Sequence, residues 1–152
     1  MDEADLLFQL DGDADVMKYI TLGIPRTMDE VIEKSMPRVL QSYQDKSDFG
    51  IFAAYLINSD EYIGWFQFEK DKEFEDSIEI GWRLKKQYWG NGYATEVAIV
   101  LCELGINMGK TIVARAMVEN LASIRVMEKA GLKFEKKFWY PHSSSPDVLY
   151  KR

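Results

Sequence analysis

The sequence has little of what several classes of protein require. Cys102 is the single cysteine, so no disulfide can form within the chain, and a reducing cytoplasm is the expected compartment. The single histidine, His142, lies in a serine-rich stretch without neighbouring metal ligands, so we predict no metal site. No apolar run is long enough to cross a membrane, and the acidic residues 2–5 differ from the basic start of a signal peptide.

Positive charge is also scarce relative to negative charge. The chain has 19 Lys and Arg against 25 Asp and Glu, which gives a formal net charge of −6 at pH 7. Nucleic-acid binding depends on basic patches, so we expect no nucleic-acid partner, whereas an acidic surface weakly favours amines. With 47% hydrophobic residues in 152, the chain is expected to form a single domain over residues 1–152, as a monomer or a homodimer.

The first third of the chain has the capping signals of helices. Thr27, followed three positions later by Glu30, has the pattern of a capping box at a helix start. Pro37 lies inside that helix and is expected to kink or divide it, because proline has no backbone N–H to donate. Two shorter helices are expected before it, over residues 2–9 and over residues 16–20 with Asp13 or Asp15 as the cap.

After Asp48 the chain changes to short β-branched and aromatic runs, which are typical of strands. Later strands alternate with a long amphipathic helix that Gly109 ends and with a second helix from Asn120 to Gly131. The expected strands cover residues 49–57, 62–68, 77–84, 111–118, 132–139 and 148–150. The predicted fold class is therefore α+β, with a mixed, largely antiparallel sheet flanked by helices.

The most informative stretch joins the third strand to the long helix and reads Gln-Tyr-Trp-Gly-Asn-Gly over residues 87–92. Asn91-Gly92 alone is typical of a hairpin turn, but the helical spacing after it indicates a strand, a turn and a helix. The first N–H groups of such a helix point outward at the positive end of its dipole, which suits a phosphate. The spacing matches neither the dinucleotide fingerprint, which needs glycine at Thr95, nor a P-loop.

A second segment, Asn-Leu-Ala-Ser over residues 120–123, opens the later helix. Together the two segments resemble the GCN5-related N-acetyltransferase (GNAT) family, and Asn-x-x-Ser with the tryptophan-rich strand resembles its RimJ/RimL-like branch of ribosomal-protein N-terminal acetyltransferases. The resemblance implies acetyl-CoA as co-substrate, with its pyrophosphate on the glycine loop and its pantetheine arm near Asn120. The residues assigned to coenzyme A are Trp82, Arg83, Leu84, Gln87, Tyr88, Trp89, Gly90, Asn91, Gly92, Tyr93, Ala94, Thr95, Asn120 and Ser123.

The activity that the resemblance implies is transfer of an acetyl group to a primary amine by direct attack on the thioester. Glu79 is the candidate base, because an amine must lose a proton before it attacks; the alternative is a solvated or salt-bridged carboxylate. Ser123 is the candidate acid for the departing thiolate and Tyr150 the reserve, because Met127 stands where many family members have tyrosine. The acceptor is a small-molecule amine or a protein N-terminus.

Two departures from the family pattern leave alternatives open. The chain has no strand signal before its first helix, where the family normally has a strand, and it lacks the usual tyrosine. Both favour the alternative of a non-catalytic acyl-CoA-binding module. A third alternative is an interaction domain in which Asn91-Gly92 is merely a turn.

Overall fold

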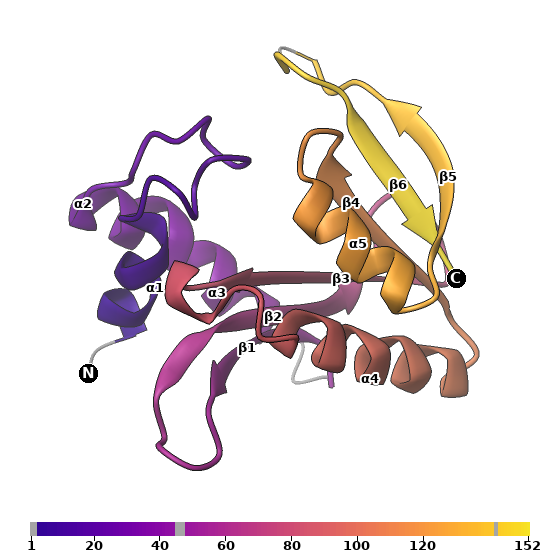
Figure 1. The fold of residues 1–152 in the computed structure, drawn as a ribbon, viewed down its shortest axis with the longest axis horizontal. Helices are drawn as coiled ribbons and strands as arrows, with labels where there is room; N and C mark the ends of the chain where they lie inside the picture. Colours follow the sequence, from indigo (N-terminus) through magenta and orange to yellow (C-terminus); the bar gives the residue numbers. More distant parts are fainter. Residues whose placement is uncertain (1–2, 45–47, 142) are drawn as a thin grey trace. The chain divides into compact units, whose positions relative to one another are not determined.

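The computed structural model describes residues 3–44, 48–141 and 143–152, so His142 lies outside the described residues. The predicted α+β fold is confirmed, with a six-stranded sheet in the order β1-β2-β3-β4-β6-β5. The elements, labelled in Figure 1, are α1 (Glu3–Asp11), α2 (Met28–Glu30), η1 (Val31–Ser35), α3 (Met36–Ser42), β1 (Gly50–Tyr55), β2 (Tyr62–Lys70), β3 (Ser77–Leu84), η2 (Lys86–Tyr88), α4 (Tyr93–Asn107), β4 (Thr111–Met117), α5 (Leu121–Lys129), β5 (Lys133–Phe138) and β6 (Asp147–Lys151). Within residues 3–44 the structure has helices and turns and no strand.

The capping box at the start of α2 is confirmed. Thr27 Oγ1 accepts the N–H of Glu30 at 3.2 Å, and the N–H of Thr27 donates to the Glu30 carboxylate at 3.1 Å. Pro37 divides the following helix as predicted, because a π-helical turn, η1, precedes α3. At this junction the N–H of Met36 donates to the carbonyl of Val31, which is the wider spacing of a π turn.

The helix predicted over residues 16–20 is wrong, because this segment forms turns. Asp13 does cap the segment, since its Oδ1 accepts a backbone hydrogen bond at 2.8 Å. The carbonyl of Met17 then accepts from several later amides, including those of Thr21 and Gly23, at 3.0 and 3.2 Å. These bonds converge on one carbonyl instead of advancing by one residue at a time, so no regular helix propagates.

The predicted strands are confirmed with small changes at their ends. β3 pairs in parallel with β4, which places Glu79 opposite Val113. β6 lies between β4 and β5 and pairs antiparallel with both, an order that the sequence did not predict. The alternation predicted for β3 is also present, because Ile78 and Ile80 are 1% and 2% exposed while Glu79 between them is partly exposed.

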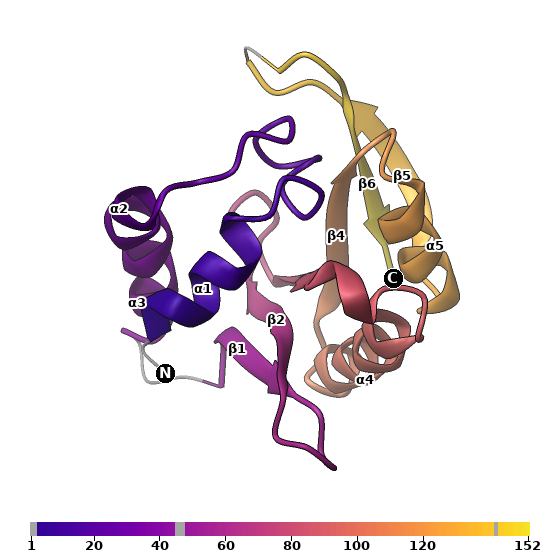
Figure 2. The same cartoon turned by 60° about the vertical axis from the view of Figure 1, so that its left-hand side comes forward.

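Two compact units divide the chain, and each is described by itself. The first contains Met1–Gln67 and Trp82–Asn91, and the second contains Phe68–Gly81 and Gly92–Arg152. In the first unit α1, η1 and α3 contact one another, and α3 contacts β1 (Figure 2). In the second, α4 and α5 contact each other and β4. Among the residues that the structure describes, no helix is long and apolar enough to span a bilayer.

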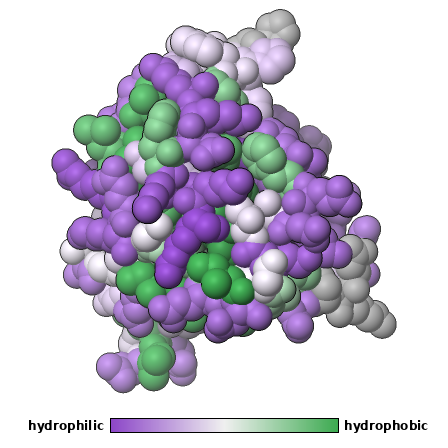
Figure 3. Space-filling view, turned by 90° about the vertical axis from the view of Figure 1, so that its right-hand side faces the viewer, coloured by the Kyte–Doolittle hydropathy of each residue, from purple (hydrophilic) through white to green (hydrophobic). Residues whose placement is uncertain are grey.

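Hydrophilic residues cover most of the face shown in Figure 3, and hydrophobic residues appear there in small groups. The side chains that form the apolar interior of the second unit come mainly from β3, β4 and the inner faces of α4 and α5. They include Ile78, Ile80, Ala98, Cys102, Ile112, Val113, Ala114, Met127 and Leu149. Burial raises the pKa of the Cys102 thiol, as expected for a packing residue.

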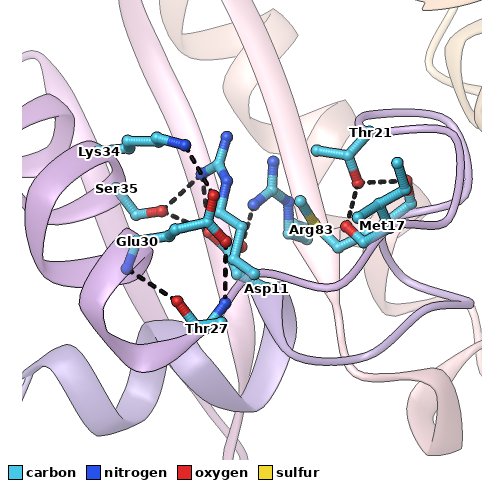
Figure 4. Close-up of polar contacts among 10 residues, drawn as sticks. Asp11, Met17, Thr21, Thr27, Glu30, Lys34, Ser35 and Arg83 are labelled. Carbon is cyan, nitrogen blue, oxygen red and sulfur yellow. Dashed lines mark hydrogen bonds and ion pairs between the residues drawn. The ribbon is translucent and has the colours of Figure 1, made fainter.

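A buried carboxylate organises the first unit. Asp11, at the end of α1, has no exposed surface and accepts hydrogen bonds from Arg26 at 3.0 Å, from Ser35 at 2.5 Å and from Arg83 (Figure 4). Burial lowers the pKa of Arg83, and the charge of Asp11 opposes this. The Arg83 guanidinium also lies 5.0 Å from the ring centre of Trp65. The network therefore connects α1, η1 and the end of β3.

Asp11→Asn is expected to lower the free energy of unfolding by about 3 kcal/mol, because it leaves Arg26 and Arg83 without their anionic partner. Asp15→Asn is the matched control. Asp15 pairs with Lys86 at the surface, where the two side chains are 56% and 58% exposed, so the control should cost less than about 1 kcal/mol. Urea unfolding followed by tryptophan fluorescence measures both, and equally small losses would contradict a stabilising role for the buried network.

Candidate functional site

The loop between β3 and α4 has the conformation of an anion-binding turn. Gly90 and Gly92 have φ angles of +79° and +87°, and a Cβ at either position would meet no atom within 4 Å. The backbone conformation, and not packing, therefore requires glycine. Gly92 is the N-cap of α4 and has no side chain to accept the first amides, and the first backbone bond runs from Glu96 N to Gly92 O at 2.9 Å. The predicted strand, turn and helix are confirmed, and the turn residues Gly90, Asn91 and Gly92 before the helix are exposed.

Side chains of the loop fix its path. Trp89 Nε1 donates to the carbonyl of Leu84 at 2.8 Å, and Asn91 Nδ2 donates to the carbonyl of Trp89 at 3.3 Å. Gln87 Nε2 donates to the hydroxyl of Tyr88 at 3.0 Å. Tyr88 is buried, whereas Trp89 is 48% exposed. The loop is thus held by the buried ring of Tyr88 and by the indole N–H of Trp89, whose ring is about half exposed.

Three residues at the end of β3 were also assigned to coenzyme A. The Arg83 guanidinium pairs with Asp11, Leu84 is buried and Trp82 is partly buried. We therefore expect Arg83 to contact the cofactor through its backbone. Gly64 on β2 allows this backbone to approach closely, because a Cβ there would lie 2.1 Å from the Arg83 carbonyl oxygen.

The start of α5 lies in the second unit. Asn120 caps it as predicted, with its Oδ1 accepting the N–H of Ser123 at 3.2 Å. Ser123 is partly buried in the first helical turn. Because α4 and α5 each follow one of the two parallel strands β3 and β4, the two helices start at the same edge of the sheet. Tyr93, Ala94 and Thr95, at the start of α4, are partly buried.

Tyr150 occupies a different position from Ser123. It is 7% exposed on β6, its ring lies edge-on to Phe134, and its hydroxyl is 3.3 Å from a carboxylate oxygen of Glu128. Burial raises the pKa of the Tyr150 hydroxyl, and the charge of Glu128 adds to this. Ser123 and Glu128 are separated by roughly 7 Å along the axis of α5. Met127, between them, is a buried core residue at 1% exposure.

The candidate base, Glu79, is held by an arginine that the sequence analysis missed. Arg115 Nη1 on β4 donates to Glu79 at 3.0 Å and to Asp71 at 2.5 Å, and its Nη2 lies 3.3 Å from Glu73. The side chains of Arg115 and Asp71 are only 9% and 1% exposed. The sequence does contain an indication of this contact, because Arg115 is the single charged residue in an otherwise apolar predicted strand, and a buried charge requires partners.

The electrostatics of this cluster follow from burial and pairing. Burial by itself lowers the pKa of Arg115, but its hydrogen bond to Asp71 and the charge of Glu79 outweigh that effect and hold the pKa above its ordinary value. Burial likewise raises the pKa of Asp71, and the hydrogen bonds from Arg115 and two backbone amides bring it below its ordinary value. Across the described ranges, no group of three or more His, Cys, Asp or Glu side chains is arranged to hold a metal ion.

Known proteins resemble this chain in sequence and in fold. A family model described as an acetyltransferase (GNAT) domain matches residues 1–133. FsC-acetyl coenzyme A-N(2)-transacetylase of Aspergillus fumigatus is 29% identical over 154 residues, and the match covers 93% of this chain but only 63% of that protein. A GNAT-family acetyltransferase from Bacillus anthracis aligns with a TM-score of 0.79 at 28% identity, over 99% of this chain and 88% of its own. Aminoglycoside acetyltransferase AAC(6')-Ib, solved with coenzyme A, aligns with a TM-score of 0.74 at 25% identity, over 100% and 91%.

The lowered pKa of Asp71 predicts how stability depends on pH. Between its pKa in the folded state and about 3.9 in the unfolded state, the folded chain binds fewer protons, so stability rises with pH there. The contribution of Asp71 is present above about pH 4 and is lost as the pH falls through the folded-state value. Asp71→Asn should therefore remove part of the acid-side loss and cost about 1–3 kcal/mol at pH 7.

Urea unfolding between pH 2.5 and 7 tests this expectation. Glu75→Gln removes an exposed carboxylate from the same connection between β2 and β3 and should cost less than about 0.5 kcal/mol at pH 7. An Asp71→Asn curve parallel to that of the unchanged chain across the acid range would contradict the prediction.

Proposed function

Because the chain belongs to the GNAT family of acetyltransferases, whose co-substrate is acetyl-CoA, we propose that it transfers the acetyl group of acetyl-CoA to a primary amine. The observation that carries this proposal is the exposed turn at Gly90, Asn91 and Gly92, which leads into α4 and gives its first amides no side-chain cap. The open space at both glycines fits a pyrophosphate, whose oxygens accept hydrogen bonds from backbone N–H groups. In this proposal the loop residues 87–95 hold the pyrophosphate, and Asn120 and Ser123 hold the pantetheine arm.

The finer placement is the RimJ/RimL-like branch. It is supported by the Asn120-x-x-Ser123 motif, in which Asn120 caps α5 and Ser123 stands in its first turn. Tryptophans on β2 and β3, at positions 65 and 82, and Trp89 in the loop add to this support. A protein N-terminus is then one candidate acceptor, beside small-molecule amines.

The proposed reaction needs one group to accept a proton and one to donate a proton. Glu79 accepts a proton from the protonated amine, directly or through water, and the amine nitrogen then attacks the thioester carbonyl carbon. As the carbon–sulfur bond breaks, Ser123 donates a proton to the departing sulfur and regains one from the acylated nitrogen, which loses its second proton to become an amide; Tyr150 is the reserve donor. Ser123 is the better donor because the hydroxyl of Tyr150 lies beside Glu128, near the opposite end of α5.

The charge around Glu79 supports an amine as the acceptor. Three carboxylates surround the single guanidinium of Arg115, so the cluster has an excess of negative charge that attracts a protonated amine. The name of AAC(6')-Ib, one of the similar proteins, describes transfer to aminoglycosides, which are amines. The competing function is acyl-CoA binding without transfer, which the salt-bridged state of Glu79 and the core position of Met127 favour.

We expect acetyl-CoA to bind with a dissociation constant at or below the high micromolar range in isothermal titration, and absence of binding would contradict the proposal. Transfer is measured as thiol release from acetyl-CoA with spermidine, kanamycin and a peptide that has a free N-terminus.

Glu79→Gln should lower turnover at neutral pH by at least about a hundredfold while acetyl-CoA affinity stays within about twofold. Binding without transfer to any of these amines would favour the acyl-CoA-binding alternative.

Gly92→Ala should weaken acetyl-CoA binding by about tenfold, because alanine is strained at a positive φ and its methyl group occupies the space in front of the helix start. Gly109→Ala is the matched control. Gly109 follows the other end of α4 with a φ of +72° and has equally open surroundings, so its replacement carries the same strain. The control should lose stability similarly and keep its acetyl-CoA affinity; equal affinity in both variants would remove the loop from the proposed site.

A further inference from the structure

Arg115 reaches Glu79 because of the register of two neighbouring strands. Glu79 on β3 lies opposite Val113 on β4, and Arg115 is two positions beyond Val113. Side chains two apart on a strand share a face, so Arg115 lies on the same face of the sheet as Glu79. Its Nη1 donates to the Glu79 carboxylate at 3.0 Å. The contact is therefore set by the parallel pairing and not by a mobile surface side chain.

Asp71 holds the arginine in turn. Its Oδ1 accepts the backbone N–H groups of Glu73 at 2.9 Å and of Phe74 at 2.7 Å, and its Oδ2 accepts from Arg115 at 2.5 Å. The Arg115 guanidinium lies 5.8 Å from the ring centre of Phe74. Asp71 is thus fixed by the backbone of the connection between β2 and β3, and Arg115 is fixed between that anchor and Glu79.

The way Arg115 divides its contacts points to a positioning role. A guanidinium that only stabilises a carboxylate commonly binds it through two parallel hydrogen bonds. Here Nη1 is shared between Asp71 and Glu79, and Nη2 faces Glu73. Arg115 contacts Glu79 at one carboxylate oxygen, and the Glu79 side chain is 29% exposed. A single hydrogen bond of this kind orients the carboxylate without enclosing it.

We propose that Arg115, anchored by Asp71, is the positioning residue for the Glu79 carboxylate and acts on acetyl transfer only through it. This inference rests on the proposed function, in which Glu79 is the base. The nearly buried arginine of the apolar strand β4 then has a role in the reaction. Loss of Arg115 is expected to lower turnover and to leave acetyl-CoA affinity unchanged.

Several charged or titratable groups face this cluster from the packed elements. Glu73 and Asp71 come from the connection before β3, and Tyr140 and Asp147 come from the segment between β5 and β6 and from β6 itself. Burial raises the pKa of both Tyr140 and Asp147, and the charge of Arg115 opposes this in each case. Removal of Arg115 therefore alters the field at several groups, so the pH profile alone does not identify Glu79.

A double-mutant cycle of Arg115→Gln and Glu79→Gln identifies it. Arg115→Gln is expected to lower kcat by about tenfold to a hundredfold with the acetyl-CoA dissociation constant within about twofold, as for a displaced catalytic group. In the Glu79→Gln background, Arg115→Gln should have almost no further effect on kcat, because the group on which it acts is absent. Additive losses in the cycle would overturn the proposal and leave Arg115 with a structural role only.

Two further variants keep the test decisive. Arg115→Lys retains the charge without the shared Nη1 geometry and should lose less kcat than Arg115→Gln. If Arg115→Gln fails to fold, the same cycle is run with Arg115→Lys. Lys110→Gln removes a cation that pairs with the exposed Asp76 in the same unit, and it should leave kcat within about twofold.

The outcomes separate this inference from the proposed function. No transfer by the unchanged chain to spermidine, kanamycin or the peptide overturns the proposed function itself. Transfer that survives Glu79→Gln unchanged overturns Glu79 as the base. Transfer that falls with Glu79→Gln but not with Arg115→Gln or Arg115→Lys overturns the positioning role alone.

Discussion

The parallel pairing of β3 with β4 is the constraint on which the candidate site depends. Two parallel neighbours cannot be joined by a hairpin, so the chain must cross over between them, and α4 is that crossover. The next connection leaves β4 from the same edge and begins α5. The same pairing brings Glu79 and Arg115 onto one face. The parallel pairing therefore accounts for the common edge of the two helix starts and for the shared face of the charged pair, while Gly92 and Asn120 specify where each helix begins.

Each of the two units contains a buried ionic network, and the group that links several partners has the opposite sign in each. In the first, the anion Asp11 is paired with the cations Arg26 and Arg83, and in the second the cation Arg115 is surrounded by carboxylates. Burial of an isolated charge is costly, so each arrangement holds only while its partners remain in place. The consequence differs between them, because Asp11 is enclosed whereas the cluster around Arg115 reaches a partly exposed carboxylate. The network around Asp11 therefore stabilises the first unit. The network around Arg115 includes Glu79, which solvent and ligands can reach.

Sequence reasoning succeeded wherever a local rule decides the structure. The capping box at Thr27, the cap at Asn120, the division at Pro37 and the glycine turn before α4 all depend on neighbouring residues alone. It failed at residues 16–20, where hydrogen bonds converge on a single carbonyl.

Contacts between distant segments were also out of its reach. Asp11 pairs with Arg83, and Arg115 pairs with Glu79, although the partners are far apart in the chain. Their positions in the sequence do not indicate that they lie close together in the fold. The order of β5 and β6 in the sheet likewise depends on pairing between distant segments. The roles proposed for Glu79, Ser123 and Tyr150 remain predictions.

The insertion of β6 between β4 and β5 has a consequence for biosynthesis. β4 can pair with β3 as soon as both have emerged, but its other edge and the whole of β5 have no partner strand until residues 147–151 have also emerged, because β6 pairs with both. At about 5–20 residues per second the waiting time is a matter of seconds, during which the edges of two strands are unpaired. The second unit therefore completes its sheet only after β6 has emerged. Until then, a chaperone or a second nascent chain competes for the place that β6 will take.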